Sequence, residues 1–339
     1  MGRRVKPRIV AIYELAMNAD IYAEWLCRRG QRVIRTASSY WHSEGYGVYQ
    51  AFPYHWLIEP SASEIRELMW RHRATILRFS SPTKDGNLRS EDGYHAVYTG
   101  ADYDLESLSS WARKNVRRGL RNSTVEQITF DRYLEEGWDL RVDTLARQHR
   151  DLGESRNAWR QIYAAAADLE GFEVWAALVE SRLAATVVTF QMDGWAYMIY
   201  QQCHHQYLRE HVNNALSFAV TQSLIRRPGI QGIFYVMKSL DAPASVDEFK
   251  FRMGYAAKPV RQRVNFHPCL ALLANPLTCV VAKIATRVRP QNRLIAKAEG
   301  LLRLNKSDRR SDQLCDHRSQ QSETMRHANS QSTKPSVIP

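Results

Sequence analysis

The sequence predicts an α/β protein, with α+β character, in which mixed sheets are flanked by helices. Three apolar runs follow one another closely, at Phe172–Val179, Leu183–Met192 and Trp195–Cys203. Asp193–Gly194, between the last two, favours a tight hairpin. A helical pattern, a fourth apolar run at Ile230–Met237 and a second helical pattern ending at Gly254 come next. A meander that leads into helix, strand and helix forms an α/β layer with a cleft at one strand end.

Length and composition fit a folded chain of two ordinary domains. The chain has 339 residues and is 44% hydrophobic, which is enough for a sizeable core and excludes wholesale disorder. A net charge of +12 favours phosphates, acidic lipid or nucleic acid as partners without choosing among them. The five cysteines form no C-x-x-C pair, so we expect a reducing compartment and no metal site.

The ends of the chain carry no strong targeting signal. Glu14 interrupts the apolar part of the basic N-terminus early, so we do not expect a signal peptide. No window reaches the roughly 18 uninterrupted apolar residues of a spanning helix. A cytoplasmic protein is expected.

Residues 1–130 form a first unit of short strands and helices. The strand-like runs are Gln31–Thr36, Tyr46–Phe52, Thr75–Phe79, Tyr94–Thr99 and Val125–Phe130. Ser61 or Ser63 can cap a helix that reaches Arg71. A second helix can begin at Ser107, Ser109 or Ser110. It carries five cations, which are Arg113, Lys114, Arg117, Arg118 and Arg121.

Residues 131–268 form a second unit that contains the meander. Two helices precede the meander, and Gly153 and Gly171 fit as their C-terminal stops. After the second helical pattern, Lys258–Phe266 is a closing strand.

Residues 269–305 form a basic, amphipathic helical extension, and 306–339 a polar tail that we expect to be disordered. Residues 257–310 hold twelve Lys or Arg against two acidic residues, a net +10 of the chain's +12. Three interpretations of 270–310 stay open: helices packed on the body, peripheral contact with an acidic inner membrane surface, or RNA binding. In the membrane interpretation the inward residues are Leu272, Leu273, Leu277, Val280, Val281, Ile284 and Leu294.

The segment IYQQCHHQYLREHVNN, after the third run, is a candidate phosphate site. A strand that opens into a helix exposes backbone N–H groups that bind anions, and His204, His205 and Arg209 add positive charge. The alternative is an ordinary polar loop. Asn213 and Asn214 either cap the helix or face a ligand.

Two segments resemble the Fem-type branch of the GNAT acyltransferase superfamily. SSWARKNVRRGLRNSTVEQITF is similar to that family's Arg-rich helix and following strand, and VDEFKFRMGY to its F-K-x-x-aromatic/apolar-G signature. The resemblance covers roughly residues 70–268. It implies two GNAT-like halves around a cleft, 1–130 and 131–268, and transfer of an acyl or aminoacyl group from a thioester or charged tRNA to an amine. The residues it implies for substrate binding or catalysis are Phe249, Lys250, Gly254, Arg113, Asn115, Arg117 and Arg118.

The segment departs from the GNAT pattern at the cofactor loop. The Q/R-x-x-G-x-G/A loop is missing, and no glycine lies between Trp195 and Pro228. The backbone can then approach a pyrophosphate less closely. The residues we expect to hold acyl-CoA (acetyl-CoA) instead are Ile199, Gln201, His205, Arg209, Asn213 and Asn214.

Acyl transfer to an amine needs a base, an oxyanion donor and an acid. The candidate bases are His204, His205, Glu210 and Asp241. Backbone N–H groups around Ile199–Gln201 can hold the oxyanion, and Tyr200 or Tyr235 can protonate a leaving thiolate. Each tyrosine can equally be a half-buried strand residue. Cys203 is the one candidate nucleophile, against the alternative of a buried thiol.

These features lead to three functional hypotheses. The first is an N-acyltransferase that uses acyl-CoA and acts on a small or carbohydrate-linked amine, as in cell-envelope or polysaccharide biosynthesis. The second is a tRNA-dependent aminoacyl or peptidyl transferase acting on a cell-envelope precursor, the only one in which nucleic acid is a partner in catalysis. The third is a non-catalytic binder of membrane surfaces or nucleic acid on a degenerate GNAT fold.

Overall fold

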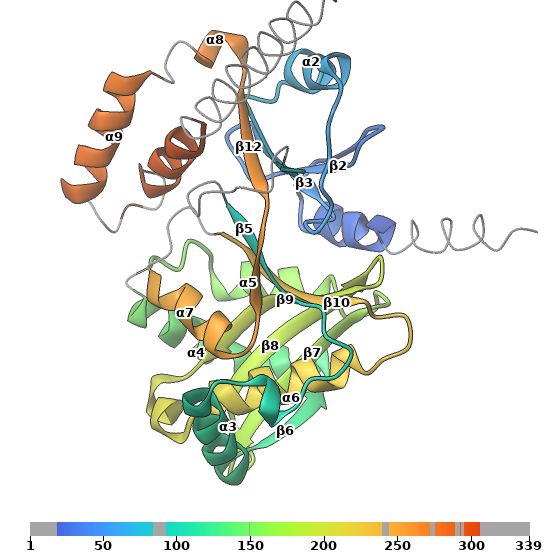
Figure 1. Cartoon of the computed structure of the whole chain (residues 1–339), viewed down its shortest axis with the longest axis vertical. Coiled ribbons are helices and arrows are strands. Elements are labelled where there is room, and N and C mark those ends of the chain that lie inside the picture. Colours follow the sequence, from blue (N-terminus) through green and yellow to red (C-terminus); the bar gives the residue numbers. More distant parts are fainter. Residues whose placement is uncertain are drawn as a thin grey trace, which may run out of the picture.

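The computed structural model describes residues 19–83, 93–148, 150–238, 244–271, 275–288, 292 and 295–305. Strands of these residues form two mixed sheets with helices against them (Figure 1). The smaller sheet has the order β1-β2-β3-β4-β12, and the larger one β11-β5-β10-β9-β8-β7-β6. The predicted class, an α/β protein with mixed sheets, is confirmed.

The smaller sheet comes mainly from the first part of the chain. Its strands are β1 (Val33–Arg35), β2 (Tyr40–Ser43), β3 (Val48–Phe52), β4 (Ile76–Ser81) and β12 (Arg261–Phe266). The parallel pair β3–β4 is connected through α2 (Ala62–Trp70), since parallel strands need a crossover. Ser61 caps α2 by accepting the Glu64 N–H, one of the two predicted caps. Strand β2 was not predicted, because four residues are too short to show a pattern.

The larger sheet contains the predicted meander. Its strands are β5 (Tyr94–Tyr98), β6 (Thr124–Ile128), β7 (Phe172–Val179), β8 (Arg182–Met192), β9 (Trp195–Cys203), β10 (Gly232–Met237) and β11 (Ala256–Pro259). Strands β6 to β9 pair antiparallel in succession. Asp193 and Gly194 both have positive φ, as a two-residue primed turn requires.

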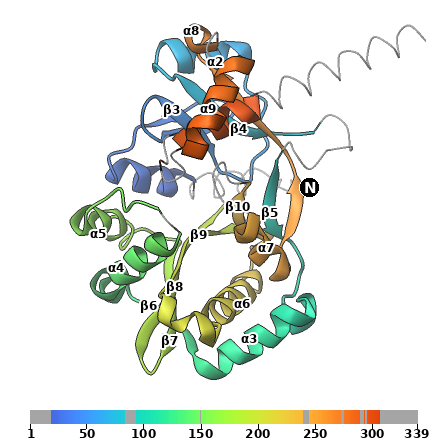
Figure 2. The same ribbon diagram turned by 90° about the vertical axis from the view of Figure 1, so that its left-hand side faces the viewer.

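Helices cover both faces of the larger sheet. They are α3 (Ser110–Asn122), α4 (Phe130–Arg147), α5 (Arg156–Ala164), α6 (Val212–Ile225) and α7 (Ala244–Arg252), with short 3₁₀ helices η1 (Leu105–Ser107) and η2 (His205–Glu210). Figure 2 shows α4 and α5 on one side of the sheet and α3 and α6 on the other. Each side has its own buried core.

The two sheets do not divide the chain at residue 130, the expected boundary. Strands β5 and β6 and helix α3 precede that residue, yet they belong to the larger sheet. The expected strand Lys258–Phe266 is in fact two strands, β11 and β12, separated by the buried Val260. Strand β11 pairs with β5 and β12 with β4, so one continuous segment joins both sheets. Which sheet a strand joins is decided by partner strands far away in the chain. The local sequence of a strand does not reveal those partners.

One hydrophobic core reaches both sheets. The helix of residues 19–28 contributes Tyr22 and Trp25. The Tyr22 ring lies 5.4 Å from Phe52 of the smaller sheet, and the Trp25 ring lies 5.0 Å from Phe172 of the larger one. Aromatic pairs at such distances add to the free energy of burial. The two sheets therefore form a single packed body.

The C-terminal extension is helical where it is described. It contains α8 (Pro268–Ala271), α9 (Pro276–Val288) and a helix of residues 295–305. Leu301 and Leu304 of the last helix pack against Val264 of β12. Among the helices of the described residues, none is both long and apolar enough to cross a membrane. The tail expected to be disordered, 306–339, lies outside the described residues.

We expect the free energy of unfolding to fall already at a pH well above the pKa values of the carboxylates. Burial lowers the pKa of His42 to about 4, and burial together with neighbouring positive groups lowers that of His95 to about 3. From pH 6.5 down to about 4, the unfolded chain binds protons that the folded chain does not bind. The stability that the neutral histidines contribute is therefore fully present above pH 6.5. Below that pH it falls, by on the order of 2–3 kcal/mol for His42.

Urea unfolding followed by tryptophan fluorescence between pH 7.5 and 4.5 measures this loss. A His95→Gln variant should show a shallower pH dependence than the parent chain. An unchanged slope in that variant would show that His95 is not a source of the acid sensitivity.

Candidate active site

The candidate site lies where two parallel strands separate. Strands β9 and β10 pair only at Gly232–Phe234 with Trp195–Tyr197. Strand β9 continues to Cys203 and β10 to Met237, and these described residues form no further β9–β10 pair. The backbone of β9 after Tyr197 thus has one edge without a neighbouring strand. We call this separation the splay.

A β-bulge follows the last pair on each side of the splay. Ile199 is the extra residue of β9 against β8, and Tyr235 is the extra residue of β10 against β5. A bulge bends its strand and changes the direction of the side chains that follow. Ile199 and Tyr200 both pack toward the core shared by the two sheets, whereas Gln201 points to α6.

Four side chains form a polar cluster in the splay. The Tyr235 hydroxyl donates a hydrogen bond to Oε1 of Gln201, and the Ser217 hydroxyl donates to the same oxygen at 3.4 Å. Nε2 of Gln201 donates to Oδ1 of Asn213, also at 3.4 Å. The Gln201 amide is therefore held in one orientation by α6 and β10. The sequence predicted Gln201, Asn213 and Tyr235 as site residues, and the fold brings these three together.

Lys250 and the other residues of the F-K-x-x-x-G signature lie beside this cluster. Lys250 of α7 is buried, and its Nζ lies 5.7 Å from the centroid of the Tyr235 ring. Phe249 packs in the core under α6 and α7. Gly254 has a φ of +82°, and a Cβ there would lie 3.0 Å from the Ser107 carbonyl oxygen, so a side chain is excluded.

The Tyr235 hydroxyl of this cluster stays protonated at neutral pH. Burial raises the pKa of Tyr235 far above its ordinary value, an effect that the hydrogen bond with Ser217 only reduces. The phenol therefore keeps its proton and can donate a hydrogen bond to an oxyanion, but it is too weak an acid to protonate a leaving thiolate as predicted.

The N-terminus of α6 lies next to the splay and has no side-chain cap. His211 at the N-cap has a left-handed backbone (φ 56°), and its side chain makes no capping hydrogen bond. Asn213 is the second residue of α6 and bonds to Gln201, so the predicted capping role of Asn213 is wrong. Asn214 is buried and donates to Met253 Sδ at 3.5 Å.

Helix α3 packs directly against this N-terminus. A Cβ on Gly119 would lie 2.5 Å from the His211 carbonyl oxygen, so the approach requires glycine. Burial and the nearby Arg118 both lower the pKa of His211. Arg118 and the uncapped helix end together give this corner positive potential, which favours a phosphate.

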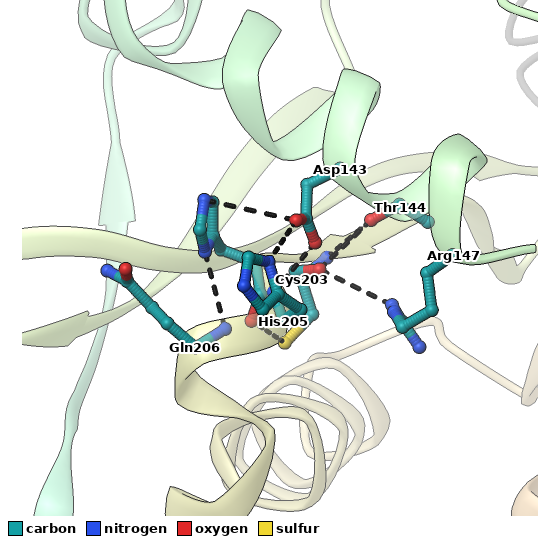
Figure 3. A network of polar contacts seen from close by, with 7 residues as sticks. Asp143, Thr144, Arg147, Cys203, His205 and Gln206 are labelled. Atoms are coloured by element: carbon teal, nitrogen blue, oxygen red, sulfur yellow. Dashed lines mark hydrogen bonds and ion pairs between the residues drawn. The ribbon is translucent and has the colours of Figure 1, made fainter.

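His205 lies on the α4 side of the sheet end, beside Asp143 (Figure 3), and His204 is next to it. Nδ1 of His205 bonds to Oδ1 of Asp143, and its backbone N–H donates to Oδ2 at 2.6 Å. His204 stacks on His205 and lies 4.0 Å from the same carboxylate. Partial burial would raise the pKa of Asp143, but hydrogen bonds from His205 and the charge of the two histidines lower it.

Asp143, His204 and His205 place their ligand atoms within 4.8 Å of one another, a set that a transition metal accepts. Asp143 is a residue that the sequence analysis missed, because its partners are about 60 residues away in the chain. Ser217 was also missed, although it lies one helical turn after Asn213 and so on the same face of α6.

Cys203 is not suited to be a nucleophile. It is buried, and burial raises the pKa of its thiol to about 12, with Arg147 opposing the effect only in part. The thiolate is the reactive form, so the thiol is inert at neutral pH. The alternative of a buried structural thiol is the one that the structure supports.

The fold matches solved structures closely enough to be recognised. The structure of FemX superposes with a TM-score of 0.53 and 10% identity, covering 80% of this chain and 100% of that one. The C-terminal domain of a putative lysylphosphatidylglycerol synthetase from Agrobacterium fabrum gives 0.51 and 14%, covering 82% and 97%. Neither family models nor curated proteins match the sequence.

The chain shares the fold of FemX and of this synthetase domain. The predicted resemblance is confirmed at the level of the fold. Identities this low show the fold alone.

Two other predicted residues, Tyr200 and Arg209, lie away from the polar cluster. Tyr200 packs on Tyr163 of α5, with ring centroids 5.6 Å apart, on the opposite face of β9 from Gln201. Arg209 is exposed in η2. Asp241 lies outside the described residues.

The Arg-rich helix α3 carries a cationic stripe on its outer face. Ser110, Arg113, Lys114, Arg117 and Arg121 surround an open depression of about 360 Å³. Arg113 pairs with Glu106 at 2.8 Å. Asn115 points the other way and is buried. Because α3 packs on α6, it lies against the larger sheet together with the splay, and not in a separate half as expected.

We expect Asp143→Asn to destabilise the protein by about 1–2 kcal/mol at pH 7, since the carboxylate accepts two hydrogen bonds that hold η2. The lowered pKa means that this stabilisation is complete above the ordinary pKa of 3.8 and is lost as pH falls through the folded-state value. Urea unfolding measures it. Asp139→Asn, at an exposed position of the same helix, is the matched control. Equal stability of the two variants at pH 7 would contradict the anchoring role.

Proposed function

We propose that this protein transfers an acyl group from an acyl thioester to an amine at the splay. The observation that carries the proposal is the separation of β9 from β10 beside protonated donors. Tyr235, Gln201 and Lys250 converge there, and a strand edge of β9 lies without a neighbour on the β10 side.

The donor proposed is acyl-CoA, with acetyl-CoA as the simplest case. An extended arm that carries amide groups can hydrogen-bond to a lone strand edge in the manner of an added strand. A pyrophosphate at the other end of that arm suits the uncapped start of α6 near Arg118. Arg118 and the backbone N–H groups at the start of α6 would take the place of the absent glycine-rich loop.

In the proposed reaction, the amine nitrogen forms a bond to the acyl carbon, and the C–S bond then breaks. The developing oxyanion needs a donor, and the thiolate needs a proton. Tyr235 can donate a hydrogen bond to the oxyanion, because its phenol stays protonated. The cluster offers no base, so the proton that the attacking amine releases passes through water to the thiolate.

The acceptor proposed is an amine on a small or carbohydrate-linked molecule in the cytoplasm. The basic character of the chain favours an acceptor or carrier that bears phosphate or another acid group. Cell-envelope or polysaccharide biosynthesis is a setting that supplies such molecules.

We expect Tyr235→Phe to lower kcat by about 100-fold with little change in KM, because the phenol acts on the charge of the transition state. Release of free thiol from acetyl-CoA, with a panel of amino sugars as acceptors, measures turnover. Tyr200→Phe removes the same atom on the opposite face of β9 and should leave turnover nearly unchanged.

Lys250→Met keeps most of the side-chain volume and should also reduce transfer without unfolding the chain. Full activity of that variant would remove Lys250 from the site. A larger loss in Tyr200→Phe than in Tyr235→Phe would place the chemistry on the other face of the sheet.

A second candidate donor is an aminoacyl-tRNA, and the stripe on α3 favours it. Arg113, Arg117 and Arg121 repeat every four residues, about 6 Å apart along the helix. That spacing suits successive phosphates of a nucleic acid backbone. One structural neighbour is named as a putative synthetase of lysylphosphatidylglycerol, an aminoacylated lipid. The acceptor would then be a cell-envelope precursor.

If tRNA is the donor carrier, Arg117→Gln with Arg121→Gln should weaken tRNA binding and lower the slope of log affinity against log salt by about 2. Filter binding over a salt series measures both. Arg66→Gln in α2 with Arg71→Gln at its C-terminal cap removes the same charge elsewhere and is the control. Failure of both acyl-CoA and charged tRNA to bind at micromolar levels would instead favour the non-catalytic binder.

A further inference from the structure

Helix α9 presents its large apolar side chains outward. The side toward the body holds the half-buried Thr278, Cys279, Ala282, Ala285 and Thr286. The outer side carries a stripe of aliphatic residues, each 54–73% exposed: Leu277, Val280, Val281, Ile284 and Val288. This arrangement is the reverse of an ordinary surface helix, which turns its apolar stripe to the core. We call these five residues the α9 stripe.

The α9 stripe is bordered by positive charge. Lys283 and Arg287 are exposed, and helical spacing places both along one edge of the stripe. The sequence of α9 contains no acidic residue. On the next helix, of residues 295–305, Lys297 and Arg303 pair with Glu44 and Glu299 and so do not add to this edge. Apolar residues edged by lysine and arginine, without acids, match the acyl boundary and anionic headgroups of a bilayer.

The surroundings of α9 are apolar too. A cavity of about 570 Å³ lies between this extension and the smaller sheet. Its lining includes Thr278 from the inner side of α9, Leu301 and Leu302 from the next helix, and Ile76 and Phe266 from the sheet. Figure 1 shows α9 at the periphery, and among the described residues no strand or helix lies beyond it in this view. The extension therefore can approach a flat surface without rearranging the body.

We propose that the α9 stripe docks this protein on an anionic lipid surface. The 13 residues of α9 would lie in the plane of the interface, with the stripe in the acyl boundary and the cations at the phosphates. The charge of the chain supports this occupant over a second copy, because two such surfaces of net positive charge repel each other. The inference is independent of which donor the splay uses.

Vesicle co-sedimentation of the full chain tests the proposal. The probe is phosphatidylcholine vesicles with and without phosphatidylglycerol. We expect binding only with the anionic lipid, and weaker binding at high salt. Val280→Ser with Ile284→Ser, and separately Lys283→Gln with Arg287→Gln, should each lower the partition coefficient about tenfold or more.

The matched control is Trp70→Ser, which removes an exposed apolar side chain on α2. It should leave vesicle binding unchanged, and an unchanged melting temperature should show that all variants are folded. Equal vesicle binding by the α9 variants and the parent would overturn the proposal. A molar mass that rises with protein concentration in light scattering would also overturn it if Val280→Ser with Ile284→Ser abolished that rise. The stripe would then be an interface between two copies of the chain.

Discussion

The short parallel pairing of β9 with β10 is the constraint on which the candidate site depends. Only three residues of each strand pair, and a bulge follows on each side, at Ile199 and Tyr235. Hydrogen bonds to β8 and β5 keep the separated strands extended. The two strands cannot collapse onto each other, and they keep a free backbone edge of β9 next to the largely half-buried polar cluster. The proposed chemistry needs that rigid separation more than it needs any one residue.

The rest of the molecule supports this geometry from two sides. Gly119 lets α3 approach the first turn of α6, which brings positive charge to the uncapped helix end. On the opposite face, the core around Tyr22, Trp25 and Phe172 fixes the smaller sheet to the larger one. The segment β11–β12 joins both sheets by pairing with each. The uncapped start of α6, the splay and the contact between the two sheets are therefore parts of one body, with α9 at its periphery.

The sequence predicted much of the fold because its signals are local. The meander of three apolar runs, the Asp193–Gly194 turn and the F-K-x-x-x-G signature each lie within a short window. The site was predicted less completely. Tyr200 and Gln201 are neighbours in a strand and point to opposite faces, but the bulge at Ile199 decides which face each one takes, and no local pattern reveals a bulge. His204 and His205 meet Asp143 of α4, a partner that only the packed helix supplies.

By itself, the sequence determined the α/β class, the meander, the cationic character of the helix after Ser109 and the concentration of charge near the C-terminus. These follow from periodicity and composition, which depend on residues close together in the chain. Only the tertiary structure decided which sheet each strand joins, which face Gln201 and Tyr235 share, and that the aliphatic side chains of α9 point away from the body. Those outcomes depend on contacts between residues far apart in the chain. No pattern confined to one segment specifies them.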